Sequence, residues 1–120
     1  MATVELTTAN FDEVTSGDGI VLVDFWASWC GPCVRFAPTY EKVSSENEDI
    51  VFGKVDTEAQ QALGAKFNIQ SIPTVMAIRD GVIVFSQAGA LPEKSLRDLI
   101  TQVRGLDMAE VKAKVAAQGA

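Results

Sequence analysis

The hydrophobic positions of this chain fall into short apolar runs, separated by stretches in which apolar residues recur every three or four positions. The clearest run, Ile20–Trp26, is apolar on both faces, rich in β-branched residues and preceded by glycines, which is typical of a central strand in a covered sheet. A helical repeat follows over 32–48, and 50–55 forms the next apolar strand. Weaker patterns predict a short first strand at 4–6 and a short helix around 11–14.

Two turn signals divide the middle of the chain. The spacing Thr57-x-x-Gln60 is a capping-box pattern and predicts that a helix begins there. Farther along, apolar strands at 74–78 and 82–85 are joined through Asp80-Gly81, which is a strong signal for a tight hairpin turn. These two strands are therefore expected to be antiparallel.

A final amphipathic helix is expected to close the domain. Pro92 suits the first position of this helix, an apolar stripe repeats along it, and Gly105 marks its end. Residues 1–105 are thus predicted to form one α/β domain with three layers, α/β/α, around a mixed sheet of about five strands. The spacing Asp107-x-x-Glu110 predicts one more helix, so that 106–120 forms a short helical extension of the same domain.

Composition narrows the class of protein. With 120 residues, of which 48% are hydrophobic, the chain is long enough to bury one core without metals or several disulfides. No apolar run approaches the roughly 20 residues of a membrane span, so no membrane partner is expected. A net charge of −6 offers no basic footprint for nucleic acid, so the expected partners are proteins.

The N-terminus bears on the compartment. Residues 1–6 lack a basic segment followed by an apolar stretch and a small-residue cleavage site. Together with the initiating Met1, this predicts that no signal directs export and that the protein works in the reducing cytoplasm. Nothing in the sequence demands an assembly larger than a monomer.

The candidate chemistry lies in the segment Trp29–Cys33, where two cysteines are separated by two residues. The chain has no other cysteine and no histidine. Zinc and iron-sulfur sites need four ligands drawn mainly from cysteine and histidine, so no metal is expected. A disulfide across so short a loop stabilises the fold by only about 2 kcal/mol, which makes it a poor structural staple. Thiol-disulfide exchange is the simplest remaining function of the pair.

The position of the motif gives the two cysteines different roles. Cys30 stands at the start of the helix, where unpaired N–H groups and the helix dipole stabilise a thiolate. Gly31 lets the backbone approach the sulfur, and Pro32 stiffens the bend without the loss of a needed hydrogen bond. Cys33 lies a turn inside the helix and is expected to be more buried. Cys30 is therefore the predicted nucleophile towards a substrate disulfide, and Cys33 the predicted resolving thiol.

Two segments, Asp24–Cys33 (DFWASWCGPC) and Ile72–Thr74 (IPT), resemble the thioredoxin family, and the likeness extends over about 4–104. The resemblance implies a thioredoxin fold and a general protein-disulfide reductase that carries no cofactor of its own. It also implies two kinds of partner, which are disulfide-bearing protein substrates and an NADPH-linked flavoenzyme, thioredoxin reductase.

Two charged residues are candidates for tuning the thiols. Asp24 interrupts an apolar strand, and burial there is expected to raise its pKa so that it can accept a proton from Cys33. From position alone, Asp24 could also face solvent at the strand end or cap the next helix. The resemblance favours burial behind the second cysteine and places Lys54 across the sheet from Asp24, whereas spacing alone also allows a solvent-facing lysine.

The resemblance also supplies a substrate-docking surface. It implies that Pro73 follows a cis peptide bond and lies against the cysteine pair, whereas the sequence alone allows an ordinary proline at a strand start. The backbone of Ile72 could then pair with an extended substrate. Trp29, Gly89 and Ala90 are expected to complete an apolar contact surface with Ile72.

Alternatives and departures from the family remain open at this stage. Val34 follows the second cysteine where many members of the family carry lysine, and Arg35 is expected to compensate in part. Among enzymes, an oxidase or isomerase on the same fold is the rival function, although Gly31-Pro32 is typical of the reductant type. The rival from another class of function is a non-catalytic binding subunit, in which the redox chemistry of the cysteines is incidental.

Overall fold

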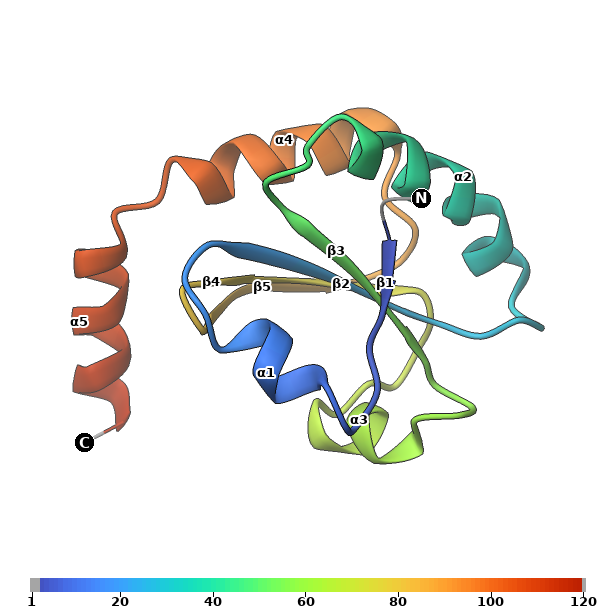
Figure 1. Cartoon of the computed structure of the whole chain (residues 1–120), viewed down its shortest axis with the longest axis horizontal. Helices are drawn as coiled ribbons and strands as arrows, with labels where there is room; N and C mark the ends of the chain where they lie inside the picture. The colour runs from blue at the N-terminus through green and yellow to red at the C-terminus, as the bar shows by residue number, and fades with distance from the viewer. Residues whose placement is uncertain (1–2, 120) are drawn as a thin grey trace.

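The computed structural model describes residues 3–119 of the chain and shows a central sheet between two layers of helices (Figure 1). Residues 1, 2 and 120 lie outside the described part, and so does the Met1 on which the expected native start rests. The strands are β1 (Thr3–Glu5), β2 (Ile20–Trp26), β3 (Val51–Asp56), β4 (Thr74–Arg79) and β5 (Val82–Ala88). The helices are α1 (Phe11–Thr15), α2 (Gly31–Ser45), α3 (Gln61–Lys66), α4 (Glu93–Arg104) and α5 (Met108–Gly119).

The five strands form one mixed sheet in the order β1-β3-β2-β4-β5. β3 pairs in parallel with both β1 and β2, whereas β2 with β4 and β4 with β5 are antiparallel. The run predicted from the sequence as a central strand is therefore the middle strand of the sheet, and six of its seven residues are buried. The predicted three-layer α/β/α fold with a mixed five-stranded sheet is confirmed.

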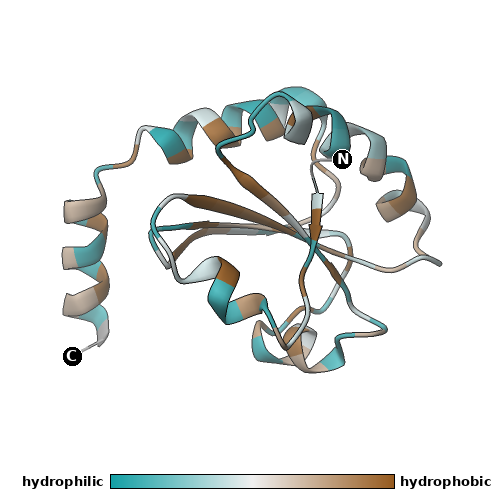
Figure 2. Ribbon diagram, in the orientation of Figure 1, coloured by the Kyte–Doolittle hydropathy of each residue, from teal (hydrophilic) through white to brown (hydrophobic). Residues whose placement is uncertain are grey.

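Alternation along β2 directs side chains into two cores. Ile20 and Leu22 pack with α2 and α4 on one face, and Val21, Val23 and Phe25 pack with α1 and α3 on the other. In Figure 2 the hydrophobic residues accordingly concentrate on the strands and on the sheet-facing sides of the helices. Asp24 shares the face of Ile20 and Leu22, because side chains two residues apart lie on the same side of a strand.

The hairpin prediction is confirmed and the capping-box prediction is wrong. Asp80 and Gly81 have φ angles of 52° and 79° between β4 and β5, as the tight turn requires. The third helix begins only at Gln61, and the Thr57 hydroxyl donates to the carbonyl of Trp26 instead of capping that helix. The Gln60 side chain accepts from the amide of Thr8, so both residues of the predicted box serve tertiary contacts.

The ends of α4 and α5 depart little from the sequence pattern. Pro92 is the residue that precedes α4, one position earlier than predicted, and Gly105 ends the helix as predicted. Arg79 donates to three carbonyls at the end of α4 and in the link that follows. Asp107 accepts from the amide of Glu110 at the start of α5, which confirms the predicted cap.

The last helix, α5, stands away from the sheet at the far end of the molecule from α2 (Figure 1). Its side chains are half-buried or exposed along the described length. That 106–120 is an extension of the same domain stays a prediction. Within residues 3–119 no helix is both long and apolar enough to span a membrane.

Gly53 in the middle of β3 shows how tightly the sheet is covered. A Cβ atom there would overlap the buried Leu6 side chain and lie 3.3 Å from the carbonyl oxygen of Leu22. The carbonyl of Gly53 also accepts a 2.8 Å hydrogen bond from the hydroxyl of Tyr40 in α2. Neither neighbour has room to retreat, because Leu6 is fully buried and the Leu22 oxygen is backbone.

Replacement of Gly53 by alanine is therefore expected to lower the free energy of unfolding by about 1–3 kcal/mol, through overpacking. The matched control is Gly64→Ala in α3, where an added Cβ would meet nothing within 4 Å. That variant is expected to gain about 0.5–1 kcal/mol, because alanine is the better helix former. Chemical denaturation measures both values, and a Gly53→Ala protein as stable as the parent would contradict the packing described here.

Candidate active site

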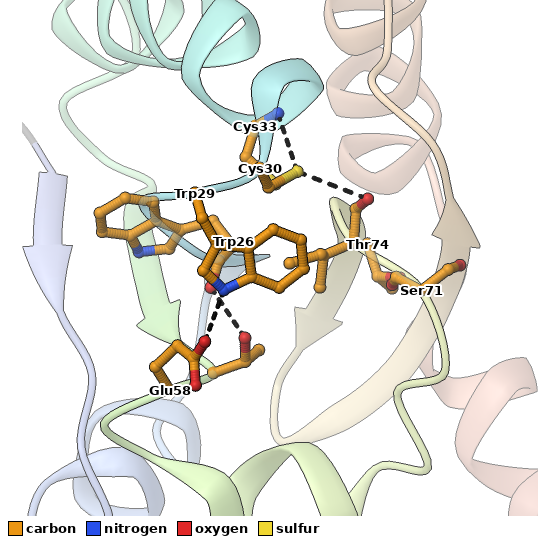
Figure 3. Close-up of a disulfide and its surroundings, with 9 residues drawn as sticks. Trp26, Trp29, Cys30, Cys33, Glu58, Ser71 and Thr74 are labelled. Atoms are coloured by element: carbon orange, nitrogen blue, oxygen red, sulfur yellow. Dashed lines mark hydrogen bonds between the residues drawn. A yellow bond between two sulfur atoms is a disulfide. The ribbon is translucent and has the colours of Figure 1, made fainter.

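The reactive cysteines occupy the turn between the end of β2 and the start of α2. The amide of Cys30 donates to the carbonyl of Ala27, which closes this turn. Cys30 is the N-cap residue of α2, and its sulfur accepts a 3.3 Å hydrogen bond from the amide of Cys33 (Figure 3). One of the N–H groups that a helix start leaves unsatisfied is thus directed at the Cys30 sulfur.

The two cysteines are joined as a disulfide, with their Cα atoms 5.2 Å apart. Gly31 and Pro32 lie between them as the first two residues of α2, in the places predicted from the sequence. Cys33 is 1% exposed and Cys30 is 5% exposed, so Cys33 is the more buried of the two, as expected. In the described residues, no group of three or more histidine, cysteine or acidic side chains is arranged to hold a metal ion.

The loop before β4 lies against the cysteine pair. The Ile72–Pro73 peptide bond is cis, as the family resemblance implies. The sulfur of Cys30 lies 3.7 Å from the carbonyl oxygen of Ile72, within reach of a thiol donor when the pair is reduced. The carbonyl of Pro73 accepts a 2.7 Å bond from the amide of Gly89, which holds the end of β5 to this loop.

Three of the four residues of the expected contact surface line two pockets. Trp29 is 69% exposed and lines one pocket together with Ile72 and residues of α3. Ala90 lines another, which Pro32 and Leu91 share. Because Trp29 directly precedes Cys30 and Pro32 follows it by two residues, both pockets adjoin the reactive pair. The structure thus brings all four predicted docking residues, Trp29, Ile72, Gly89 and Ala90, to the loops around the disulfide.

Glu58 is a site residue that sequence reasoning missed. Its carboxylate accepts a hydrogen bond from the indole N–H of the exposed Trp29 (Figure 3). Glu58 lies 29 residues farther along the chain than Trp29, in the loop after β3, so no local pattern links the two. The bond links the exposed indole of Trp29 to the loop after β3.

Asp24 is fully buried beneath α2 and has no hydrogen-bond partner for either carboxylate oxygen among the described residues. The solvent-facing alternative for this residue is therefore wrong. Burial raises the pKa of Asp24 from 3.8 to about 7, because the charged form loses its hydration, and the positive charge of Lys54 opposes part of this rise. Asp24 can thus gain or lose a proton near neutral pH.

Lys54 lies next to Asp24 in the register of β2 and β3, as the resemblance implies. It does not form an ion pair with Asp24 or with any other described carboxylate. Its ammonium group lies instead over the ring of Trp26, 4.5 Å from the centroid, in a cation-π contact. Lys54 therefore lowers the pKa of Asp24 through the electric field of its charge, without a direct hydrogen bond to the carboxylate.

The buried carboxylate predicts an unusual dependence of stability on pH. Below about pH 3.8 both the folded and the unfolded chain hold the Asp24 proton, and above about pH 7 neither does. Between these values the folded protein keeps a proton that the unfolded chain has lost, so this group's contribution to stability falls as pH rises. At about 1.4 kcal/mol per pH unit, the full loss is about 4 kcal/mol.

Asp24→Asn keeps the shape of the side chain and removes its charge. The stability of this variant relative to the parent is expected to increase between pH 4 and pH 8 by about 4 kcal/mol. Denaturation of the oxidised proteins across this range measures the difference and avoids titration of the thiols. The matched control is Asp18→Asn in the exposed loop before β2, and a flat difference for Asp24→Asn would contradict the raised pKa.

Comparisons with known proteins agree with this geometry. The family model described as Thioredoxin matches residues 2–102. Putative thioredoxin 2 of Streptomyces coelicolor is 57% identical over 119 residues, which are 99% of this chain and 89% of that protein. Thioredoxin of Bacillus subtilis is 38% identical over 103 residues, covering 85% of this chain and 98% of its own length.

Solved structures show the same relationship. The thioredoxin structure from Plasmodium falciparum superposes with a TM-score of 0.76 at 39% identity and covers 82% of this chain and 96% of that one. In this chain the family's paired cysteines are Cys30 and Cys33, which lie at disulfide distance at the start of α2. This pair supports dithiol-disulfide exchange, and the chain belongs to the thioredoxin family of protein-disulfide oxidoreductases.

Proposed function

We propose that this protein is a general protein-disulfide reductase in which Cys30 attacks the substrate and Cys33 resolves the intermediate. The observation that carries this assignment is the hydrogen bond from the Cys33 amide to the Cys30 sulfur at the N-cap of α2. A donor of this kind and the positive end of the helix dipole both favour a thiolate at Cys30. Cys33, a turn farther inside and more buried, is the poorer first nucleophile.

The reaction proceeds in two exchanges. The Cys30 thiolate attacks one sulfur of the substrate disulfide, a Cys30–substrate bond forms, and the other substrate sulfur leaves as a thiolate. The Cys33 thiolate then attacks the Cys30 sulfur and displaces the second substrate thiolate. The two substrate thiolates then take up two protons from solvent, which replace the two that the Cys30 and Cys33 thiols gave up. The substrate has thus gained two electrons and two protons, and the protein has become the Cys30–Cys33 disulfide.

Asp24 is proposed to accept the proton of the Cys33 thiol before the second exchange. Its burial and its pKa of about 7 support this role, because a general base works best when its pKa lies near the working pH. Lys54 and the ring of Trp26 are proposed to tune this carboxylate from the neighbouring strand. Gly31, Pro32 and Pro73 are proposed as supporting residues that shape the turn and the docking loop.

The partners proposed are disulfide-bearing proteins and an NADPH-linked thioredoxin reductase, which would return the oxidised pair to the dithiol. Trp29, Ile72, Gly89 and Ala90 are proposed to contact the substrate, since they lie around the disulfide. We propose a monomer that works in the cytoplasm, since a dithiol reductant needs a reducing compartment. Oxidation of NADPH in the presence of a bacterial thioredoxin reductase and this protein tests the pairing, and cell fractionation tests the location.

The assignment of the two cysteines predicts which variant traps substrate. Cys33→Ser cannot complete the second exchange, so it is expected to accumulate a covalent adduct through Cys30, whereas Cys30→Ser is expected to form none. Non-reducing electrophoresis and mass spectrometry of a reaction with a model disulfide protein measure the adduct. With both cysteines present, Asp24→Asn is expected to lengthen the lifetime of the adduct near neutral pH. Adduct formation by Cys30→Ser instead would reverse the roles.

A further inference from the structure

The strongest feature that the reductase chemistry leaves unused is an arginine beside the disulfide. Arg35 lies one turn along α2 from Gly31, and its Nη1 atom is 3.1 Å from the place where a Cβ of Gly31 would stand. Helical side chains lean towards the start of their helix, and the missing side chain of Gly31 leaves the guanidinium room to do so. A positive charge thus lies over the residue directly after Cys30.

This arginine has no partner among the described residues, in contrast to the other three arginines of the chain. Arg79 donates to backbone carbonyls, and Arg97 and Arg104 form ion pairs with acidic side chains. Arg35 is exposed and makes no hydrogen bond or ion pair in the described part of the chain. Such a cation, at the reactive end of a protein of net charge −6, is available to pair with an acidic group on a substrate.

The surroundings of Arg35 indicate what that group belongs to. Arg35 lines a pocket with Pro32, Phe36, Ala90 and Leu91, and no acidic side chain contributes to its lining. The pocket is continuous with the docking loops, since Ala90 follows the Gly89 that is bonded to Pro73. It offers apolar walls to a side chain and a guanidinium to a carboxylate.

We propose that Arg35 determines substrate specificity: it pairs with an aspartate or glutamate near the target disulfide while the pocket receives a neighbouring apolar side chain. This inference rests on the proposed reductase function and names a substrate class for it. The planar guanidinium suits a carboxylate, which it can bind with two parallel hydrogen bonds. Because the pair forms at an exposed rim, its effect is expected to be about two- to fivefold in rate, and sensitive to salt.

The test compares disulfide peptides that differ by one charge. Each peptide carries its cysteine in a disulfide with the same neutral thiol peptide, and has aspartate, asparagine or lysine two residues before or after that cysteine. The reduced protein is mixed with each peptide, and chromatography gives the second-order rate constant. The aspartate-to-asparagine ratio within one protein variant is the readout, because any effect of Arg35 on the reactivity of Cys30 cancels in it.

At low salt the parent is expected to reduce the aspartate peptide about two to five times faster than the asparagine peptide, for at least one of the two positions. The ratio is expected to fall towards 1 in Arg35→Gln and in about 1 M salt. In Arg35→Glu the lysine peptide is expected to become the preferred one. The matched control is Lys112→Gln, which makes the same change of net charge on the distant α5 and is expected to keep the parent's ratio.

The possible failures are distinguishable. If the parent reduces the asparagine peptide but shows a ratio of 1 at both positions, or if the ratio persists in Arg35→Gln, the role of Arg35 is wrong and the reductase function stands. If the parent reduces none of the peptides, the proposed function itself is overturned, and the specificity inference falls with it.

Discussion

The structure depends on one constraint, which is that β2 is covered on both faces along almost its whole length. Alternate residues of this strand supply both cores, so the strand cannot shift its register without the exposure of one of them. The same burial encloses one carboxylate, that of Asp24, without a hydrogen-bond partner among the described residues. Burial of an ionised carboxylate there costs free energy, because the charge loses its hydration. Such a perturbed carboxylate is typical of a functional site, and Asp24 lies near the end of β2 that leads to the reactive cysteines.

The chemistry follows from what meets at this end of the sheet. The turn after β2 places Cys30 at the start of α2, where one backbone amide already points at its sulfur. The carbonyl of Ile72, in the loop before β4, lies 3.7 Å from the Cys30 sulfur, and the amide of Gly89 bonds the end of β5 to the same loop. Nucleophile, proton acceptor and docking surface therefore come from different segments, but each is fixed by a strand of one rigid sheet. Arg35 adds a charge to this surface without any other task in the described structure.

Much of this arrangement could be predicted from the sequence, because local patterns determine it. The apolar run of β2, the hairpin at Asp80-Gly81 and the helix start after Cys30 each depend on residues close together in the chain. Contacts between segments that lie far apart in the chain could not be predicted from local patterns. The spacing around Thr57 predicts that its hydroxyl caps a helix, but in the fold this hydroxyl donates a hydrogen bond to the carbonyl of Trp26. The position of Lys54 over the ring of Trp26 likewise arises only once β2 and β3 pair.

The central claim, that the Cys30–Cys33 pair serves as a protein reductant, is tested most directly by its equilibrium reduction potential in defined dithiol buffers. For this two-electron couple a difference of about 30 mV in reduction potential corresponds to about 1.4 kcal/mol, which is a tenfold change in the equilibrium constant with the dithiol buffer. The chain belongs to the thioredoxin family and carries Gly31-Pro32, the pair typical of its reductants, between the cysteines, so the potential is expected to be more negative than that of the glutathione pool. The amide that stabilises the Cys30 thiolate favours the reduced form and by itself shifts the potential the other way. A potential far more positive than that pool would contradict the claim and indicate an oxidase or isomerase.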